Sequence, residues 1–227
     1  MARKKNINEE SIIKFYMEYV LTYGKKPDSV FSFSKQYNFT EEDYYKYYGN
    51  FSLLEQSIFK VFYEKTINLL EKNEDYQNYS DRDKILSFYY SFFELLTANR
   101  SYVVFAIGSQ TKKLKNIDTL KLLKKSFCNY IDKLDINILE TNQETLDKIQ
   151  NKTLKESAWF QLVLTMKYWL EDTSPSFERT DIFIEKAVNT SFDILNIAPI
   201  KSVIDFGKFI LNHTQVVLLQ ELFELLP

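Results

Sequence analysis

The sequence predicts an all-α protein made of a small N-terminal module and a larger helical body. Only four glycines and four prolines occur among 227 residues, which leaves few turns for a β-sandwich or barrel. Apolar residues instead recur at the i, i+3, i+4 spacing of amphipathic helices along most of the chain. Hydrophobic residues make up 45% of the chain, enough to fill a sizeable core. We expect three short helices in residues 1–50 and longer helices in residues 51–227.

The first helix is expected to follow Asn8, a residue type that caps helix N-termini well, and to stop at Gly24. Its sequence is EESIIKFYMEYVLTY, in which apolar residues repeat every three or four positions. The predicted apolar face consists of Ile12, Ile13, Tyr16, Met17, Val20 and Leu21.

Two short helices should come next. Pro27 suits the first turn of the second helix. Thr40 is expected to cap the third helix, with Asp43 at the position that a capping box fills with Glu or Gln. About three residues would connect the two helices, which is the layout of a helix-turn-helix. The side of the second helix that should be buried holds Val30, Phe33 and Tyr37.

The remaining helices are expected to be longer. A fourth helix, FSLLEQSIFKVFYEKTINLLEK, should begin after Gly49-Asn50 and lead out of the module. Further helices are expected near 82–98, 100–114, 116–133, 143–171, 178–195 and 200–225. The last of these contains TQVVLLQELFELLP, whose broad apolar face must be covered. Its polar side has no lysine, which favours dimer or core packing over an anionic membrane surface.

Composition argues against an enzyme. Cys128 lies in an apolar periodic run, where a small buried residue is more common than a nucleophile, and His213 is the only histidine. The chain has no P-loop, no G-x-S-x-G and no G-x-G-x-x-G. We therefore predict no catalytic residues, no metal and no cofactor. No signal-peptide core and no stretch of eighteen uninterrupted apolar residues is found, so we expect a soluble, cytoplasmic protein without membrane insertion.

Five landmarks in residues 12–55 carry a family resemblance. Asn38-Phe39-Thr40 follows Gly24 at a distance of fourteen residues, and the other three landmarks are Phe33-Ser34, Tyr44-Tyr45-Lys46-Tyr47-Tyr48 and Gly49-Asn50-Phe51-Ser52-Leu53-Leu54. Their spacing resembles the TetR family of ligand-responsive repressors, whose counterparts read Gly-Val-Ser, Ile-Ala, Leu-Tyr-x-His-Phe and x-Ser-Lys-x-x-Leu. Asn38 tolerates the left-handed backbone that glycine adopts there. The resemblance implies a TetR-like fold with an N-terminal helix-turn-helix.

In that family the start of the third helix faces base edges, and the signature residues hold phosphates. The resemblance places Thr40, Glu41, Glu42, Tyr45 and Tyr47 at DNA. From their charge, Lys25, Lys26, Lys35 and Lys46 are expected to ring the phosphate backbone around them. Two departures stand out, because Phe51 replaces a lysine and Glu41, Glu42 and Asp43 are acidic. Acids favour a helix N-terminus whatever the helix does, and a carboxylate can also accept from cytosine. Residues 1–50 hold eight bases and seven acids, a weak excess for a DNA-binding module, although Arg3-Lys4-Lys5 would suit a phosphate-seeking arm.

For the body, the resemblance implies a ligand pocket beyond the fourth helix and a homodimer formed by the last two helices. Aromatic residues are abundant there and would line either an apolar pocket or an ordinary core. The candidates for ligand contact are Tyr102, Phe105, Trp159, Phe160, Tyr168 and Trp169. His213 would contact a ligand or a partner subunit, or simply be structural.

Two functions remain open at this point. The first is a TetR-like homodimeric transcriptional regulator that binds double-stranded DNA under the control of an apolar small molecule. The second is a protein of the same fold that no longer reads DNA and instead binds a lipid or isoprenoid. The acidic start of the third helix and the weak basic excess motivate the second.

Overall fold

The computed structural model describes residues 7–108, 117–134, 136 and 144–196. These residues form nine α-helices and three 3₁₀ turns and contain no strand, which confirms the all-α prediction. The predicted helix at 200–225, with His213 and its apolar face, lies outside the described residues. The helices are α1 Glu9–Tyr23, α2 Val30–Gln36, α3 Glu41–Tyr45, α4 Phe51–Glu71, α5 Asp81–Ala98, α6 Arg100–Ile107, α7 Lys121–Asp132, α8 Glu144–Glu171 and α9 Glu178–Asn196. The 3₁₀ turns are η1 Glu74–Asn78, η2 Ile117–Leu120 and η3 Pro175–Phe177.

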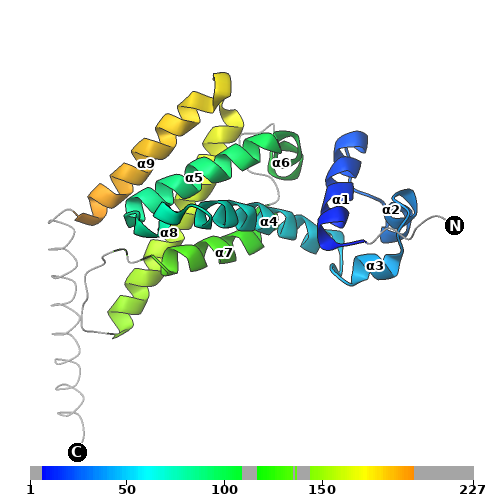
Figure 1. The fold of residues 1–227 in the computed structure, drawn as a ribbon, viewed down its shortest axis with the longest axis horizontal. Coiled ribbons are helices and arrows are strands. Elements are labelled where there is room, and N and C mark those ends of the chain that lie inside the picture. The colour runs from blue at the N-terminus through cyan, green and yellow to red at the C-terminus, as the bar shows by residue number, and fades with distance from the viewer. Residues whose placement is uncertain (1–6, 109–116, 135, 137–143, 197–227) are drawn as a thin grey trace, which may run out of the picture.

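Helices α1 to α3 gather into a module at one end of the molecule (Figure 1). Helix α4 runs from this module into the body, where it packs against α5 and α7. Helix α8 packs on α7, and α9 packs on both α5 and α8. Helix α6 contacts α1, so the body touches the module through α6 as well as through α4.

Local capping explains where the N-terminal helices begin and end. Asn8 caps α1, and Gly24 ends it with a left-handed φ of 66°, as predicted. Thr40 and Asp43 form the predicted reciprocal capping box of α3. The expectation for Pro27 is wrong, because Ser29 caps α2 and Pro27 precedes the helix. Ser29 competes well for this position since its hydroxyl accepts from the Ser32 backbone nitrogen at 3.1 Å.

The module has an aromatic core centred on Phe33. Its ring, fully buried, lies 5.4 to 6.3 Å from the ring centres of Tyr16, Tyr19, Tyr37, Phe39, Tyr44 and Phe51. Most of these contacts are edge-to-face, the geometry that aromatic pairs prefer. Tyr19 packs on Phe33 and is buried, whereas Leu21, predicted to be buried, is 47% exposed. The last turn of α1 therefore faces α2 through Tyr19.

The body has a second aromatic core, built mainly from α5 and α7. Phe88, Phe92 and Phe127 are fully buried there, and Phe88 stacks on Phe92 at 5.4 Å. Helix α6 ends at Ile107, earlier than the predicted residue 114, and residues 109–116 are outside the described part of the chain. Helices α5 and α7 also form part of the wall of a cavity in the body.

Candidate nucleic-acid interface and ligand cavity

The connection between α2 and α3 has the geometry of a helix-turn-helix. Four residues, Tyr37 to Thr40, separate the two helices, one more than expected. Asn38 takes a left-handed φ of 56°, as its place in the TetR-like spacing predicted. The Phe39 backbone nitrogen donates to the Ser34 carbonyl at 3.0 Å, and the Phe39 side chain is buried beside Phe33. The turn is thus fixed by backbone and core together.

The tyrosines of α3 and the turn after it divide between two faces. Tyr44 and Tyr48 are buried, and the Tyr48 hydroxyl donates to Glu9 Oε1 at 2.9 Å. Tyr45 and Tyr47 are 53% and 40% exposed. Phe51 packs on Tyr16, Phe33 and Tyr44, so the position that the family fills with lysine belongs here to the module core. The outward face of α3 carries hydroxyl groups and acids.

The acidic first turn of α3 is held by its own helix. Asp43 accepts from the Thr40 hydroxyl at 2.7 Å and from Lys46 Nζ at 2.9 Å. Hydrogen bonds from Lys46 and from Thr40 lower the pKa of Asp43 to about 2, so it is charged at neutral pH. Glu42 lies 3.5 Å from the same lysine, and Glu41 is half-buried. Asp43 therefore serves the helix cap, and Lys46 neutralises part of the acidic charge.

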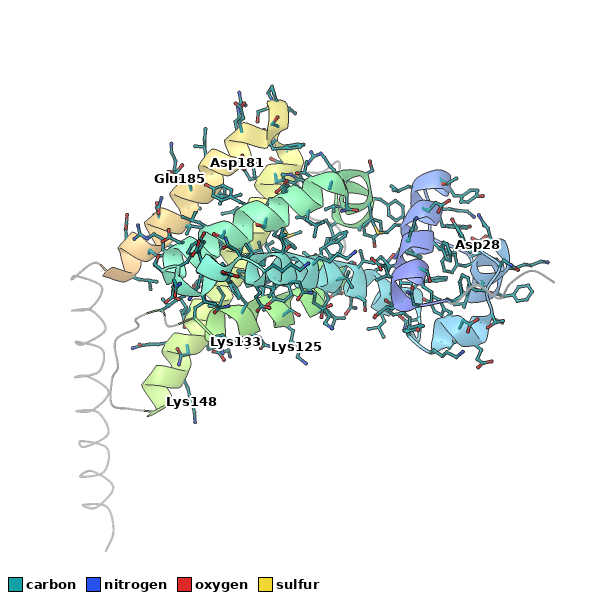
Figure 2. All side chains as sticks on the ribbon, in the orientation of Figure 1. Asp28, Lys125, Lys133, Lys148, Asp181 and Glu185 are labelled. Atoms are coloured by element: carbon teal, nitrogen blue, oxygen red, sulfur yellow. The ribbon has the colours of Figure 1, made fainter. Side chains whose placement is uncertain are left out.

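Two further lysines at this interface have carboxylate partners. Lys25 pairs with Asp28 at 3.0 Å, on the outer surface of the module where Figure 2 labels Asp28. Lys26 pairs with Glu55 at 2.8 Å. Lys35, by contrast, has no ion pair within the described residues and lies 6.0 Å from the ring centre of Phe31. A count of charges in the sequence could not separate these cases, because it does not show which carboxylates lie nearby.

Glu55 forms a buried polar joint that the sequence reading missed. Its carboxylate is 6% exposed and accepts from the Tyr16 hydroxyl at 2.5 Å and from Lys26. Burial and the hydrogen bond to Glu55 raise the pKa of Tyr16 far above its ordinary value. The buried Tyr102 hydroxyl of α6 has no hydrogen-bond partner among the described residues. Burial is the main cause that raises the pKa of Tyr102, and the Glu55 charge is a second cause. The sequence did contain a signal for this joint, because Glu55 is an acid on the mainly apolar face of α4, four residues after Phe51.

A cavity of about 510 Å³ lies in the body between α5, α7, α8 and α9. Its α8 wall uses positions spaced three or four apart, as expected for one helix face. The described residues that line it include none that is charged. They are Ile85, Tyr89, Phe127, Ile131, Ile136, Gln150, Thr153, Leu154, Ser157, Ala158, Gln161, Val188, Ser191, Phe192, Ile194 and Leu195. A mostly apolar wall with a few polar groups is typical of small-molecule sites.

A family model described as tetracyclin repressor-like, C-terminal domain, matches residues 84–210. This span covers more than half of the chain and includes the cavity-lining helices α5, α7, α8 and α9. The chain belongs to the TetR family. The match does not overlap residues 12–55, whose spacing predicted the same family, so the two ends of the chain point to it separately. No match to a curated protein accompanies it.

The six aromatic residues predicted to contact a ligand are not brought together in this TetR-family protein, and none of them lines the cavity described above. Tyr102 lies at the Glu55 joint, and Phe105 and Trp159 are half-buried against the core. Phe160 is 66% exposed and Tyr168 is stacked on Phe183 at 4.5 Å. Trp169 is buried, donates from Nε1 to Thr97 Oγ1 at 3.1 Å, and borders a smaller pocket of about 260 Å³. The sequence signal for the cavity wall was the set of small and polar residues that recur at helical spacing on α8, such as Ser157, Ala158 and Gln161. The prediction overlooked them because it looked for aromatic residues.

Other candidate chemistry in this TetR-family chain is modest. Cys128 is half-buried, and burial raises the pKa of its thiol, which keeps it protonated. Over the described ranges, His, Cys, Asp and Glu side chains do not gather into a group of three that would hold a metal. No helix within those ranges is both long and apolar enough to cross a membrane.

Proposed function

We propose that this TetR-family protein is a homodimeric transcriptional regulator whose N-terminal module binds double-stranded DNA and whose cavity binds an apolar small molecule that changes DNA affinity. The observation that carries the proposal is that the four tyrosines of residues 44–48 lie on two different faces, one buried and one exposed. Tyr44 and Tyr48 fix the helix in the core, while Tyr45 and Tyr47 present their hydroxyls outward. Outward hydroxyls suit phosphate contacts, which set the register of a module on a duplex.

In this proposal the first turn of α3, Thr40 to Glu42, faces base edges, and the two exposed tyrosines donate to phosphates. Lys25, Lys26, Lys35 and Lys46 flank the backbone. Lys35 carries most of the direct attraction, since the other three are paired with carboxylates. A dimer would double this footprint and place two modules roughly 34–36 Å apart, one turn of the duplex.

The route from cavity to module runs through α6. Arg100, at the start of α6, donates to the carbonyls of Trp169 and Leu170 at the end of α8, at 3.2 and 3.1 Å. Farther along α6, Tyr102 lies beside the Glu55 joint that also holds α1 and α4. A ligand that moves α8 would therefore act on both the body and the module. Control of this kind requires that the ligand bind the two conformations with different affinity.

A second function is favoured by one observation, the pairing of Lys25, Lys26 and Lys46 with carboxylates of this chain. Paired lysines give a duplex little net attraction. Under this alternative the protein keeps the TetR fold, does not read DNA, and binds a lipid or isoprenoid in the body. Both functions use the cavity for binding and involve no catalytic step.

Selection from random duplex DNA, at low and at moderate salt, separates the two functions. The regulator should enrich a defined, two-fold related sequence and should bind it less tightly as salt rises, because phosphate contacts release counterions. An unenriched pool with no salt-dependent binding would reject the regulator. Mass spectrometry of apolar molecules retained by the gently purified protein then tests the alternative, which a ligand-free protein would count against.

A further inference from the structure

The cavity wall contains a polar atom without a hydrogen-bond partner among the described residues. Gln150 of α8 lines the cavity, and its Oε1 is shielded from solvent and accepts no hydrogen bond from those residues. Gln161, eleven residues farther along the same face, is in the opposite condition, because its Oε1 accepts from the Ser191 hydroxyl at 2.7 Å. A buried polar group without a partner costs free energy. Of the two glutamines in this cavity, Gln161 therefore has a hydrogen-bond partner at Oε1 and Gln150 has none among the described residues.

A second polar side chain lies on the opposite wall. Tyr89 of α5 lines the cavity and is 1% exposed. Burial raises the pKa of Tyr89 well above its ordinary value, so the hydroxyl stays protonated and can donate.

The absence of charge among the described lining residues restricts the occupant. A carboxylate, phosphate or ammonium group brought into this space would lose its hydration without gaining an opposite charge, which is strongly unfavourable. The charged side chains that Figure 2 labels on α7, α8 and α9 and just after α7 lie at the outside of the body: Lys125, Lys133, Lys148, Asp181 and Glu185. Most of the rest of the wall is apolar, from residues such as Ile85, Phe127 and Val188, and its other polar residues are uncharged: Thr153, Ser157, Gln161 and Ser191.

We propose that the cavity binds an uncharged, mainly hydrocarbon molecule that carries a hydroxyl group, and that this hydroxyl hydrogen-bonds with the side-chain amide of Gln150. A hydroxyl both donates and accepts, so it can satisfy either end of the amide. The inference rests on the proposed ligand-binding role of this cavity and adds the chemical class of the ligand.

Three naphthalene derivatives of similar shape test this class by equilibrium dialysis at neutral pH. In 1-naphthol the substituent is a hydroxyl, in 1-methylnaphthalene it is a methyl group, and in 1-naphthoate it is an anion. We expect 1-naphthol to bind saturably and 1-naphthoate to bind at least about tenfold more weakly, because its charge finds no partner. Anion binding as tight as that of 1-naphthol would overturn the proposal.

Gln150→Met keeps the size of the side chain and removes the amide. The ratio of the dissociation constants of 1-methylnaphthalene and 1-naphthol should fall about three- to tenfold relative to wild type, the value of one neutral hydrogen bond. Gln77→Met, an exposed site in η1, is the matched control and should leave the ratio unchanged. An unchanged ratio in Gln150→Met, with 1-methylnaphthalene still bound, would also overturn the proposal.

Ala158→Phe locates the binding, since this wall position faces the cavity and the larger side chain should fill part of it. Loss of 1-naphthol binding in this variant, with an unchanged far-ultraviolet circular dichroism spectrum, is the expected result. Should that variant not fold, Ser157→Leu on the same wall serves instead. Binding that persists undiminished in the folded variant would place the ligand elsewhere. None of these measurements involves DNA, so failure here and failure of the regulator proposal are distinguishable.

Discussion

Two polar side chains, Glu55 at the joint between module and body and Gln150 in the body, are held in opposite ways. At the module joint, the buried Glu55 carboxylate has both Tyr16 and Lys26 as partners at 2.8 Å or less. In the body, Oε1 of Gln150 borders a cavity and has no hydrogen-bond partner among the described residues. A buried polar group with hydrogen-bond partners in the protein fixes a geometry, whereas one without a partner can bind a ligand. Glu55 is thus fixed by its partners, whereas Gln150 can still accept a hydrogen bond from a ligand. The contrast concerns these two groups and not the whole module, since the buried Tyr44 and Tyr102 hydroxyls also have no partner among the described residues.

This comparison makes separate predictions for each region, because Arg100 and α6 are the described links between them besides α4. Substitutions in the joint should change stability and module position. Substitutions in the cavity wall should change ligand affinity with little effect on stability.

The largest loss of stability is expected for Glu55→Ala. It leaves the Tyr16 hydroxyl buried without a partner and should lower the free energy of unfolding by about 2–3 kcal/mol in urea denaturation. Glu55→Gln keeps an acceptor for Tyr16 and should cost only about 1 kcal/mol. Glu64→Ala, which breaks the exposed Lys60–Glu64 pair on the same helix, is the control and should cost under about 0.5 kcal/mol. Equal losses in the free energy of unfolding for Glu55→Ala and Glu64→Ala would contradict the claim that the hydrogen bonds of Glu55 stabilise the joint.

Arg100→Ala tests the link between the regions. The guanidinium donates to two carbonyls at the end of α8 and stacks on Trp169 and Phe177 at 4.4 and 4.6 Å. Its removal should lower the free energy of unfolding by about 2 kcal/mol and speed hydrogen exchange in the last turn of α8. The control Arg179→Ala removes an exposed arginine and should change neither quantity. If exchange in α8 is the same in both variants, Arg100 does not hold the helix end.

Acid should loosen the connection between α8 and α9. Burial disfavours the charged form of Asp172, but hydrogen bonds from Ser174 and Thr180 outweigh it and lower the pKa to about 2. Because folding lowers this pKa, the contribution is fully present above about pH 4 and is lost as pH falls toward 2. Wild type should lose on the order of 1 kcal/mol more over this window than Asp172→Asn, as measured by denaturation at each pH. Parallel pH profiles for the two proteins would show that Asp172 is not the group responsible.

The smallest effect is expected in the proposed DNA-binding face, where two lysines are compared. Lys35→Ala should make the plot of log binding constant against log salt shallower by about 2 in the proposed dimer, since each copy would lose one phosphate contact. Lys26→Ala should change this slope less, because Glu55 already holds that lysine. Gel-shift titrations with the selected duplex over a salt series measure both slopes. A larger change of slope for Lys26→Ala than for Lys35→Ala would contradict our assignment of Lys35 as the lysine that attracts the duplex most.

Local rules predicted the elements better than the sites. Caps at Asn8, Thr40 and Gly24 fixed the helix ends, and the outward position of Tyr45 and Tyr47 agrees with the family spacing, because each depends on residues close in sequence. The Lys26–Glu55 pair joins residues 29 apart, and nothing local marks it. The cavity wall eluded prediction for a related reason. Gln150 and Ser157 read as an ordinary polar helix face until α5, α7 and α9 are placed opposite them.

One measurement addresses the regulator most directly: the dissociation constant of the selected duplex with and without saturating 1-naphthol, with occupancy of the cavity followed by dialysis in the same samples. We predict that occupancy raises this constant at least about fivefold, the lower end of allosteric coupling, and that Ala158→Phe abolishes the response. An occupied cavity that leaves the dissociation constant unchanged would contradict the claim that the body controls the module.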